Sequence, residues 1–321
     1  MRDVTVIIPC YNAENYIKKC ISSLERQTFD KIEIICIDDC STDNTLQVLN
    51  ELKKNCKHNI TIILNNNNLG PAESRNKGIL LAKTKYIAFC DADDWYDNNF
   101  LDIMISTIEE NNVNLVFCGY KVVNENSKIE YRNIQSARLI NTISESLFLD
   151  IDSLCMMVTK TEIMKNNLLP NIRNGEDMAV IPLLIIQAGG IAVVDKCLYN
   201  YYRRISSASQ MPTMKVVLAL EDSYKYIENN ISKKYELELE YIGIKNILYA
   251  AIITLFGFSF DTRTAKQIIN DFEKKHKNWK SNEYIKYLPK YKKIILLLIK
   301  YKLFFAIKII AEIRNKLVGI K

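Results

Sequence analysis

Three carboxylates follow an apolar run near position 90. Residues 86–90 are apolar and rich in β-forming side chains, and Asp91, Asp93 and Asp94 come directly after them. We predict that the run is a buried strand whose carboxyl end carries the acids, because α/β sheets normally bind ligands there. A divalent cation carried by a diphosphate would compensate them, since Mg²⁺ takes one or two carboxylates and adds phosphate and water oxygens. For so short a pattern, the alternative is a surface turn with solvated charges.

Further apolar runs of the same kind place this strand in a sheet. Strands are expected at residues 4–9, 32–37, 60–64 and 86–90. Between them the apolar residues recur at helical spacing, as Ile17, Ile21 and Leu24 do. Ser41 or Thr42 is placed to cap the second helix. Strand and helix alternate three times, which predicts a mostly parallel sheet with right-handed crossovers and helices on both faces.

Parallel strands bring the residues that follow them to one edge of the sheet. The predicted neighbours at this edge are Tyr11, Asp38, Asp39, Asp91 and Asp93. No turn carries G-x-G-x-x-G or a G-x-x-x-x-G-K-[ST] phosphate loop, so a Rossmann dinucleotide site and a P-loop are disfavoured. If a nucleotide binds at this edge, side chains and a metal must hold its phosphates.

Two later segments also carry residue types that could do chemistry. A helix is expected from residue 174, and Glu176 and Asp177 fall in its first turn, where acids also complement the helix dipole. Residues 199–209 are aromatic, basic and hydroxyl-rich, and they follow a short strand expected at 191–194. They suit either a solvated loop or an anion clamp, because guanidinium groups match phosphate geometry.

Charge is distributed unevenly along the 321 residues. The net charge is +6, yet residues 274–321 hold 14 lysines and arginines and only 2 acids. The nine cysteines are scattered without a C-x-x-C pair, and there are only two histidines. We therefore expect reduced thiols, no Cys/His zinc site and a cytoplasmic protein with no signal peptide ahead of the first strand.

The end of the chain is basic and very apolar. Lys300, Lys302 and Lys308 interrupt residues 294–310 before they reach the length of a bilayer span, so we expect no transmembrane helix there. A helical wheel puts these lysines on different sides, which argues against one amphipathic helix. We expect residues 284–321 to contact anionic lipid at the inner face of the plasma membrane. Packing on the body of the protein or a homodimer interface is the alternative, and the tail is too apolar for a nucleic-acid-binding arm.

Four motifs occur in order at the ends of the first four strands. They are residues 6–12 (VIIPCYN), 37–43 (IDDCSTD), 68–78 (NLGPAESRNKG) and 89–94 (FCDADD). Together they closely resemble the family 2 glycosyltransferases, whose GT-A fold is a mixed α/β sheet flanked by helices. The resemblance is specific to about residue 120, weaker to about residue 209 and absent beyond it. It implies a catalytic domain at 1–212, with a nucleotide-sugar half (1–120) and an acceptor half (121–212). For the rest of the chain, 213–321, a helical region is predicted from the sequence itself, because Val216, Leu220 and Tyr224 form one apolar stripe at helical spacing.

The resemblance implies roles for residues of these motifs. Tyr11 would stack on the base, Asp39 would accept a hydrogen bond from uracil N3–H, and Arg75 would help to fix the nucleotide. Asp91 would lie by the ribose, and Asp93, with Asp91, would bind Mn²⁺ or Mg²⁺. The nucleotide-sugar site would further include Pro9, Asp38 and Ala92.

The resemblance also covers the later segments. Glu176 and Asp177 resemble the family's Glu-Asp pair, in which the Asp is the catalytic base. Arg203 or Arg204, with Ser207, resembles the segment that meets the diphosphate. The two basic residues are adjacent here, which departs from the family's spacing and leaves open which arginine acts.

The implied activity is inverting transfer of a hexose or N-acetylhexosamine from a UDP-sugar to a hydroxyl of a glycan or lipid-linked acceptor. Surface-polysaccharide, lipopolysaccharide or capsule synthesis is the expected setting. The Q-x-x-R-W motif of processive members is absent, so one transfer per acceptor is expected. The alternative is a non-catalytic binding or scaffold protein on the same fold, for which loss of Asp93 or Asp177 would be the expected mark.

Overall fold

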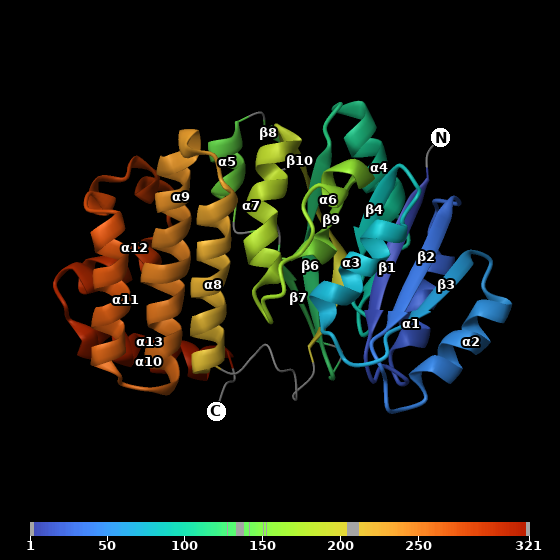
Figure 1. Ribbon diagram of the computed structural model, residues 1–321, viewed down its shortest axis with the longest axis horizontal. Coiled ribbons are helices and arrows are strands. Elements are labelled where there is room, and N and C mark those ends of the chain that lie inside the picture. Colours follow the sequence, from blue (N-terminus) through green and yellow to red (C-terminus); the bar gives the residue numbers. More distant parts are fainter. Residues whose placement is uncertain are drawn as a thin grey trace. The chain divides into compact units, whose positions relative to one another are not determined.

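Two compact units make up the chain (Figure 1). The computed structural model describes residues 3–126, 128–132, 138–140, 142–149, 151, 153–203 and 212–318. Residues 1–173 and 180–206 form the sheet unit, and residues 174–179 and 207–321 form the helical unit.

One mixed sheet runs through the sheet unit. Its strands are β1 (Val4–Cys10), β2 (Ile32–Asp38), β3 (Asn59–Leu64), β4 (Tyr86–Phe89), β5 (Trp95–Tyr96), β6 (Leu115–Asn124), β7 (Ile129–Arg132), β8 (Arg138–Ile140), β9 (Met157–Lys160) and β10 (Ile191–Arg203). They follow the order β3-β2-β1-β4-β9-β6-β10-β5, with β7 beside β6 and β8 beside β10. The first four strands pair in parallel, as predicted, whereas β9 is antiparallel to both β4 and β6.

Helices flank this sheet. They are α1 (Ile17–Glu25), α2 (Thr45–Asn55), α3 (Pro71–Leu81), α4 (Phe100–Glu110), α5 (Ile143–Leu147) and α6 (Thr161–Lys165), with α7 (Glu176–Ala188) beginning in residues 174–179. Helix α3 packs on β1 and β2, α1 contacts α2 and β5, and α4 lies against β6 and β10. The fold is therefore the mixed α/β sheet with flanking helices that the sequence predicted.

Gly78 lets α3 approach the sheet closely. A Cβ atom built on Gly78 would lie 2.5 Å from Cγ2 of Ile7 and 3.2 Å from Cδ1 of Ile37. Both isoleucines are buried in their strands, so little room exists for them to move. The missing side chain therefore sets the distance between α3 and the sheet, and with it the position of Arg75 about one turn earlier in the helix.

Strand β10 is much longer than predicted. The expected strand covered only residues 191–194, but β10 runs to Arg203 and pairs in parallel with β6 through two register shifts. Tyr199 and Asn200 are buried in it. Tyr199 to Arg203 therefore do not form the solvated loop that was one interpretation of this segment.

The helical unit contains α8 (Met214–Asn230), α9 (Glu236–Gly243), α10 (Ile252–Phe258), α11 (Thr262–Lys275), α12 (Lys290–Lys300) and α13 (Phe304–Val318). A π-helical segment, Ile244–Ala251, joins α9 to α10. Among the described residues, the helical stretch Lys233–Phe258 is the one long and apolar enough to cross a membrane by length and composition, and 72% of its most apolar part is buried in the structure. A mostly buried helix of this kind is equally typical of a protein core.

The apolar stretch at residues 294–310 is two helices and not one. It breaks at Tyr301 to Leu303, where Lys302 has a φ of +56°. The helical wheel drawn over one continuous helix was therefore wrong, because α12 and α13 each have their own buried and exposed sides.

We predict that Gly78→Ala destabilises the protein by about 1–3 kcal/mol, because the added methyl group overlaps Ile7. Without that overlap the change would stabilise α3 through the higher helix propensity of alanine. Urea unfolding measures the difference. Leu80→Ala on the exposed side of the same helix is the control, with an expected change within about 0.5 kcal/mol. A Gly78→Ala variant as stable as the wild type would contradict this account of α3 packing.

Candidate active site

The carboxyl ends of β1, β2 and β4 meet at one edge of the sheet. The register places Cys10 opposite Asp38, and backbone hydrogen bonds continue beyond the strands. Asp39 N donates to Cys10 O at 2.8 Å, and Cys90 N donates to Ile7 O at 3.1 Å. The residues that follow each strand are thus neighbours, as the sequence predicted for parallel strands.

The turns after β1 and β2 are tied together by side chains. Asn12, which has a φ of +49°, accepts a hydrogen bond at Oδ1 from Thr42 N (2.9 Å), and its own N–H donates to Ser41 Oγ (3.0 Å). Ser41 and Thr42 were predicted to cap the second helix, but α2 begins at Thr45. Their polar groups instead join the second motif to the first, so the predicted cap was wrong.

Asp39 organises the entry to α3. Its Oδ1 accepts from Asn65 Nδ2 (2.7 Å) and from Leu69 N (2.9 Å), and its Oδ2 accepts from Gly70 N (2.8 Å). Gly70 has a φ of +90°, a conformation that favours glycine. The carboxylate therefore satisfies backbone donors ahead of the helix. The role of Asp39 as an acceptor for a nucleotide base stays a prediction.

Asp38 lies beside Asp39 and is also buried. Its Oδ2 accepts weakly from Ser41 N at 3.4 Å. Within the described part of the chain, its Oδ1 has no hydrogen-bond partner. Buried polar atoms are normally paired, so Asp38 is a group at this edge whose hydrogen bonding the described residues leave incomplete.

Arg75 and Asp91 form an ion pair across the edge. Arg75 Nη2 lies 2.7 Å from Asp91 Oδ1, and the arginine side chain is 5% exposed while that of Asp91 is 38% exposed. The buried guanidinium thus holds the more accessible carboxylate in place. This contact joins α3 to the turn after β4 and brings together two predicted site residues.

Asp94 is a residue of the acidic turn, residues 91–94, that sequence reasoning left without a role. It is 1% exposed and accepts hydrogen bonds from Tyr199 Oη at 2.5 Å and from Tyr202 N at 2.7 Å. Burial raises the pKa of Asp94 well above its ordinary value, and the charges of Asp91 and Asp93 raise it further. The third acid of the D-x-D-D pattern therefore fastens the acidic turn to β10.

An aromatic cluster next to Asp94 also escaped prediction. Lys19 Nζ lies 3.0 Å from the centre of the Trp95 ring, and the Tyr202 ring is 6.3 Å from that of Trp95 and 6.0 Å from that of Tyr16. Burial lowers the pKa of Lys19. The signals in the sequence were Trp95 following the acids and the aromatic residues from 199 onwards, but nothing in the sequence showed that these segments meet.

The remaining predicted residues are placed as follows. Tyr11 is half exposed on the turn after β1, Pro9 is half-buried within β1, and Ala92 is buried between the acids. Arg203 is the last residue of β10. Arg204 and Ser207 lie outside the described residues.

Glu176 and Asp177 occupy the first turn of α7 and belong to the helical unit. Glu176 is buried, and its Oε2 accepts a hydrogen bond from Gly175 N at 3.1 Å. Ser223 of α8 donates from Oγ to Gly175 O at 2.8 Å, which holds the start of α7 against α8. Their assignment as a catalytic pair stays a prediction.

The acidic turn suits a hard divalent cation. Among the described residues, no three His, Cys, Asp or Glu side chains gather into a group that could hold a metal ion. A diphosphate-bound cation needs only one or two carboxylates. Asp91 and Asp93 are half-buried, whereas Asp94 is buried and engaged by Tyr199. The residues therefore fit Mn²⁺ or Mg²⁺ that Asp93, with Asp91, would hold beside phosphate oxygens.

Comparison with known proteins decides the family. The model of glycosyl transferase family 2 matches residues 5–168, about half of the chain. The chain belongs to glycosyl transferase family 2. The matched segment contains all four motifs and the whole edge formed by β1, β2 and β4.

Individual relatives of this family 2 chain agree with that assignment. An uncharacterized glycosyltransferase of Rickettsia conorii is 31% identical over 88% of this chain and 44% of its own length. Poly(ribitol-phosphate) beta-N-acetylglucosaminyltransferase TarS of Staphylococcus aureus is 25% identical over 81% of this chain and 45% of its own. This chain spans less than half the length of the curated relatives it matches.

The solved structures show the fold. The crystal structure of S. aureus TarS 1–349 in complex with UDP-GlcNAc has a TM-score of 0.68 and 20% identity, covering 99% of this chain and 92% of that one. The similarity includes the helical C-terminal region, since nearly the whole chain is covered. The GT-A fold predicted from the four motifs is therefore confirmed.

We predict that Tyr199→Phe destabilises the protein by about 1–3 kcal/mol, because it leaves the buried Oδ2 of Asp94 without its donor. Urea unfolding is the measurement. Tyr131→Phe removes a hydroxyl from a side chain that is 65% exposed and serves as the control. Equal stability of the two variants would show that Tyr199 does not hold Asp94.

Proposed function

We propose that this family 2 chain is a glycosyltransferase that moves a sugar from a nucleotide-sugar donor to a hydroxyl of a cell-surface glycan or its lipid-linked precursor. One observation carries the proposal: Asp91 and Asp93 stand at the sheet edge with the buried Arg75 paired to Asp91. Acids at this edge can hold the cation that a diphosphate carries, and the guanidinium of Arg75 keeps Asp91 in place among them. The names of the relatives support the acceptor class, because TarS acts on poly(ribitol-phosphate) by its name.

The donor is proposed to be a UDP-linked hexose or N-acetylhexosamine. The structure of TarS with UDP-GlcNAc supports this choice, since that chain shares the fold over nearly its whole length. Tyr11 is half exposed at the edge, where its ring can stack on a base. Asp38 has an oxygen without a hydrogen-bond partner among the described residues. It is therefore a second candidate, beside Asp39, to accept a hydrogen bond from the nucleotide.

The proposed reaction is a single in-line displacement with inversion. Asp177 takes the proton of the acceptor hydroxyl while its oxygen attacks the anomeric carbon. The bond from that carbon to the diphosphate oxygen breaks as the new bond forms, and the nucleoside diphosphate departs. When bound, the divalent cation supplies positive charge that stabilises this leaving group. Arg203 or Arg204, with Ser207, is proposed to contact the same diphosphate.

We predict that the protein releases nucleoside diphosphate from one UDP-sugar in a panel, and that release needs Mn²⁺ or Mg²⁺ and stops with EDTA. Asp93→Ala should lower the rate by about 100-fold or more, because loss of a group that stabilises transition-state charge typically costs this much. Asp195→Ala, which removes an exposed acid of β10, is the control and should be unchanged.

The same panel separates the two hypotheses. No turnover of any donor, combined with no metal-dependent binding of UDP by calorimetry, would contradict the glycosyltransferase proposal. UDP binding without turnover on any acceptor tested would favour the binding or scaffold alternative.

We predict that Asp177→Asn lowers sugar transfer about 100-fold or more and leaves UDP affinity within about twofold, because a general base acts on the acceptor and not on the nucleotide. Steady-state kinetics and calorimetry measure the two effects. Asp102→Asn removes an acid from the first turn of α4. It is the control for the alternative role of Asp177, in which an acid in a first helical turn only complements the helix dipole. If both variants keep full activity, Asp177 is not the base.

A further inference from the structure

The helical unit exposes an apolar surface at its C-terminal helices. On α12 the side chains of Tyr291, Ile294 and Leu297 are 56%, 53% and 52% exposed, and their spacing places them on one side of the helix. Tyr301 continues this side and is 61% exposed. The opposite side of α12 is buried, so the helix has two apolar sides, and within the described residues one of them stays exposed.

We call Tyr291, Ile294 and Leu297 the α12 stripe. It ends at a cluster of apolar side chains at two interhelical turns. Phe260, between α10 and α11, contacts Phe305 at the start of α13, with ring centres 6.4 Å apart. Phe260, Leu303 and Phe305 are 47%, 51% and 70% exposed. We call Phe260, Tyr301, Leu303 and Phe305 the apolar tip. It combines turns that are about forty residues apart in the sequence.

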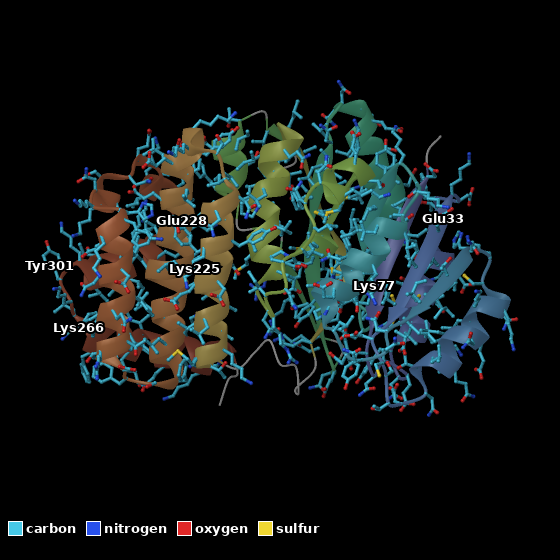
Figure 2. All side chains as sticks on the ribbon, viewed as in Figure 1. Glu33, Lys77, Lys225, Glu228, Lys266 and Tyr301 are labelled. Atoms are coloured by element: carbon cyan, nitrogen blue, oxygen red, sulfur yellow. The ribbon has the colours of Figure 1, made fainter. Side chains whose placement is uncertain are left out.

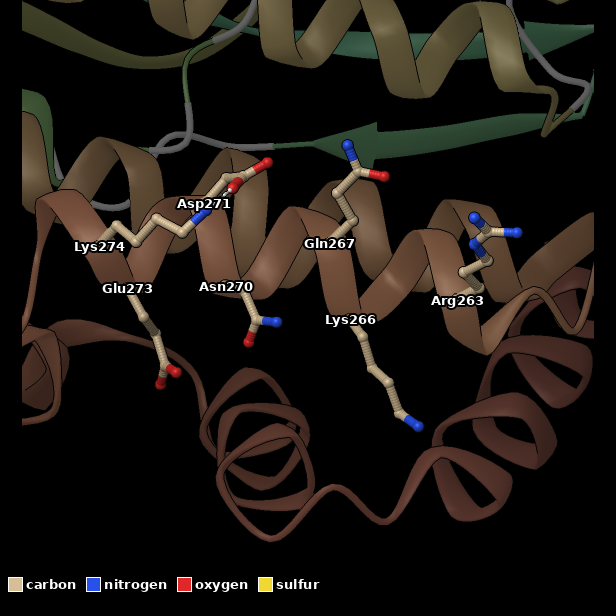
Figure 3. A pocket seen from close by; sticks show the side chains of 7 residues that line it. All are labelled: Arg263, Lys266, Gln267, Asn270, Asp271, Glu273 and Lys274. Carbon is tan, nitrogen blue, oxygen red and sulfur yellow. Dashed lines mark hydrogen bonds and ion pairs between the residues drawn. The ribbon is translucent and has the colours of Figure 1, made fainter.

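Two lysines line the same hollow as the apolar tip. A groove of about 500 Å³ is bounded by Phe260, Leu303 and Phe305 together with Lys266 and Lys302. In the part of the chain that the structure describes, neither lysine has an acid within ion-pair distance. Figure 3 shows Lys266 reaching away from α11 towards the darker C-terminal helices, and Figure 2 shows Lys266 and Tyr301 at the outer edge of the helical unit.

On the adjoining polar face of α11, the acidic side chains already have basic partners. Arg263, Lys274, Asp271 and Glu273 line a second groove, which also includes Lys266. Its acids are already paired: Asp271 with Lys274 at 2.7 Å and Glu273 with Lys280 at 3.1 Å. The surplus charge on this side of the unit is therefore positive, and it lies next to the apolar tip.

We propose that the apolar tip and the α12 stripe dock on an anionic lipid bilayer. Leu303, Phe305 and the tyrosines would lie at the boundary of headgroups and acyl chains, where such side chains are favoured. Lys266 and Lys302 would meet lipid phosphates. The choice of occupant rests on charge complementarity, because basic residues interleaved with exposed aromatic ones match a negatively charged interface.

Other occupants fit the surface less well. A second copy of the chain would set lysines against lysines across a two-fold axis, and like charges facing one another are costly. The cores of protein interfaces are also depleted in lysine, whereas Lys290, Lys293 and Lys300 lie beside or within the α12 stripe.

Vesicle sedimentation with the full chain tests the proposal. The protein should bind phosphatidylcholine vesicles containing about 30 mol% phosphatidylglycerol at least tenfold more tightly than pure phosphatidylcholine vesicles, and raising the salt from about 0.1 to 0.5 M should weaken binding. Lys266→Gln with Lys302→Gln should weaken binding about tenfold, and so should Leu303→Ser with Phe305→Ser. These positions are outside the proposed catalytic machinery, so nucleotide binding should be unaffected.

Matched pairs of substitutions on the sheet unit are the controls. Lys53→Gln with Lys54→Gln removes two exposed lysines of α2, and Leu80→Ser with Leu81→Ser removes two exposed leucines of α3. Both double variants should bind vesicles like the wild type. A Tyr301→Trp variant keeps the surface intact, and its fluorescence should be quenched by brominated lipids more than that of the wild type.

Three results would overturn the proposal. One is a wild-type chain that does not sediment with anionic vesicles. Another is binding that both tip variants retain in full while the Tyr301→Trp signal is unchanged by brominated lipid. The third is a dimer in solution that Leu303→Ser with Phe305→Ser dissociates, with no binding to vesicles, which would assign the surface to a second copy.

Discussion

Three acids within four residues repel one another, and the sheet unit depends on how each is accommodated. Asp91 is paired with Arg75, Asp94 is buried against Tyr199 and the backbone of Tyr202, and Asp93 stays half-buried at the edge. The three neighbours in sequence thus have three different environments. Burial raises the pKa of Asp94 well above its ordinary value, whereas the carboxylate of Asp91 is held by the guanidinium of Arg75.

This arrangement needs Arg75 in a fixed place, and α3 is fixed from two directions. Gly78 brings its middle onto β1 and β2, and Asp39 holds the backbone just before its first turn. Asp39 therefore stabilises the start of α3, whether or not it also binds a ligand. Three donors already reach its two oxygens, which leaves less acceptor capacity for a base than an unengaged carboxylate would have. The incomplete hydrogen bonding of its neighbour Asp38 gains interest for the same reason.

An element could be predicted from the sequence where its burial produces a recognisable pattern in neighbouring residues. The strands β1, β2 and β4 are buried on both faces, so each is a continuous apolar run that can be recognised from a few residues. The polar end of β10 has no such apolar run. Its place in the sheet comes from backbone pairing with β6 and from the hydrogen bond of Tyr199 to Asp94, a partner 105 residues away. Ser41 and Thr42 looked like helix caps for a similar reason, because their bonds to Asn12 come from another turn.

The C-terminal helices show how one wrong assumption hides a surface. Treated as one helix, residues 294–310 place their lysines on all sides and lose any amphipathic pattern. The break at Tyr301 to Leu303 restarts the helical phase, so the apolar residues divide into a buried set and an exposed set. The buried set, including Ile295, Ile299 and Ile307, holds the helical unit together. The exposed set forgoes about 25 cal/mol for each Å² of apolar surface left in water. Apolar side chains aligned in this way contribute little to folding, and this is the physical reason for which we propose a partner surface.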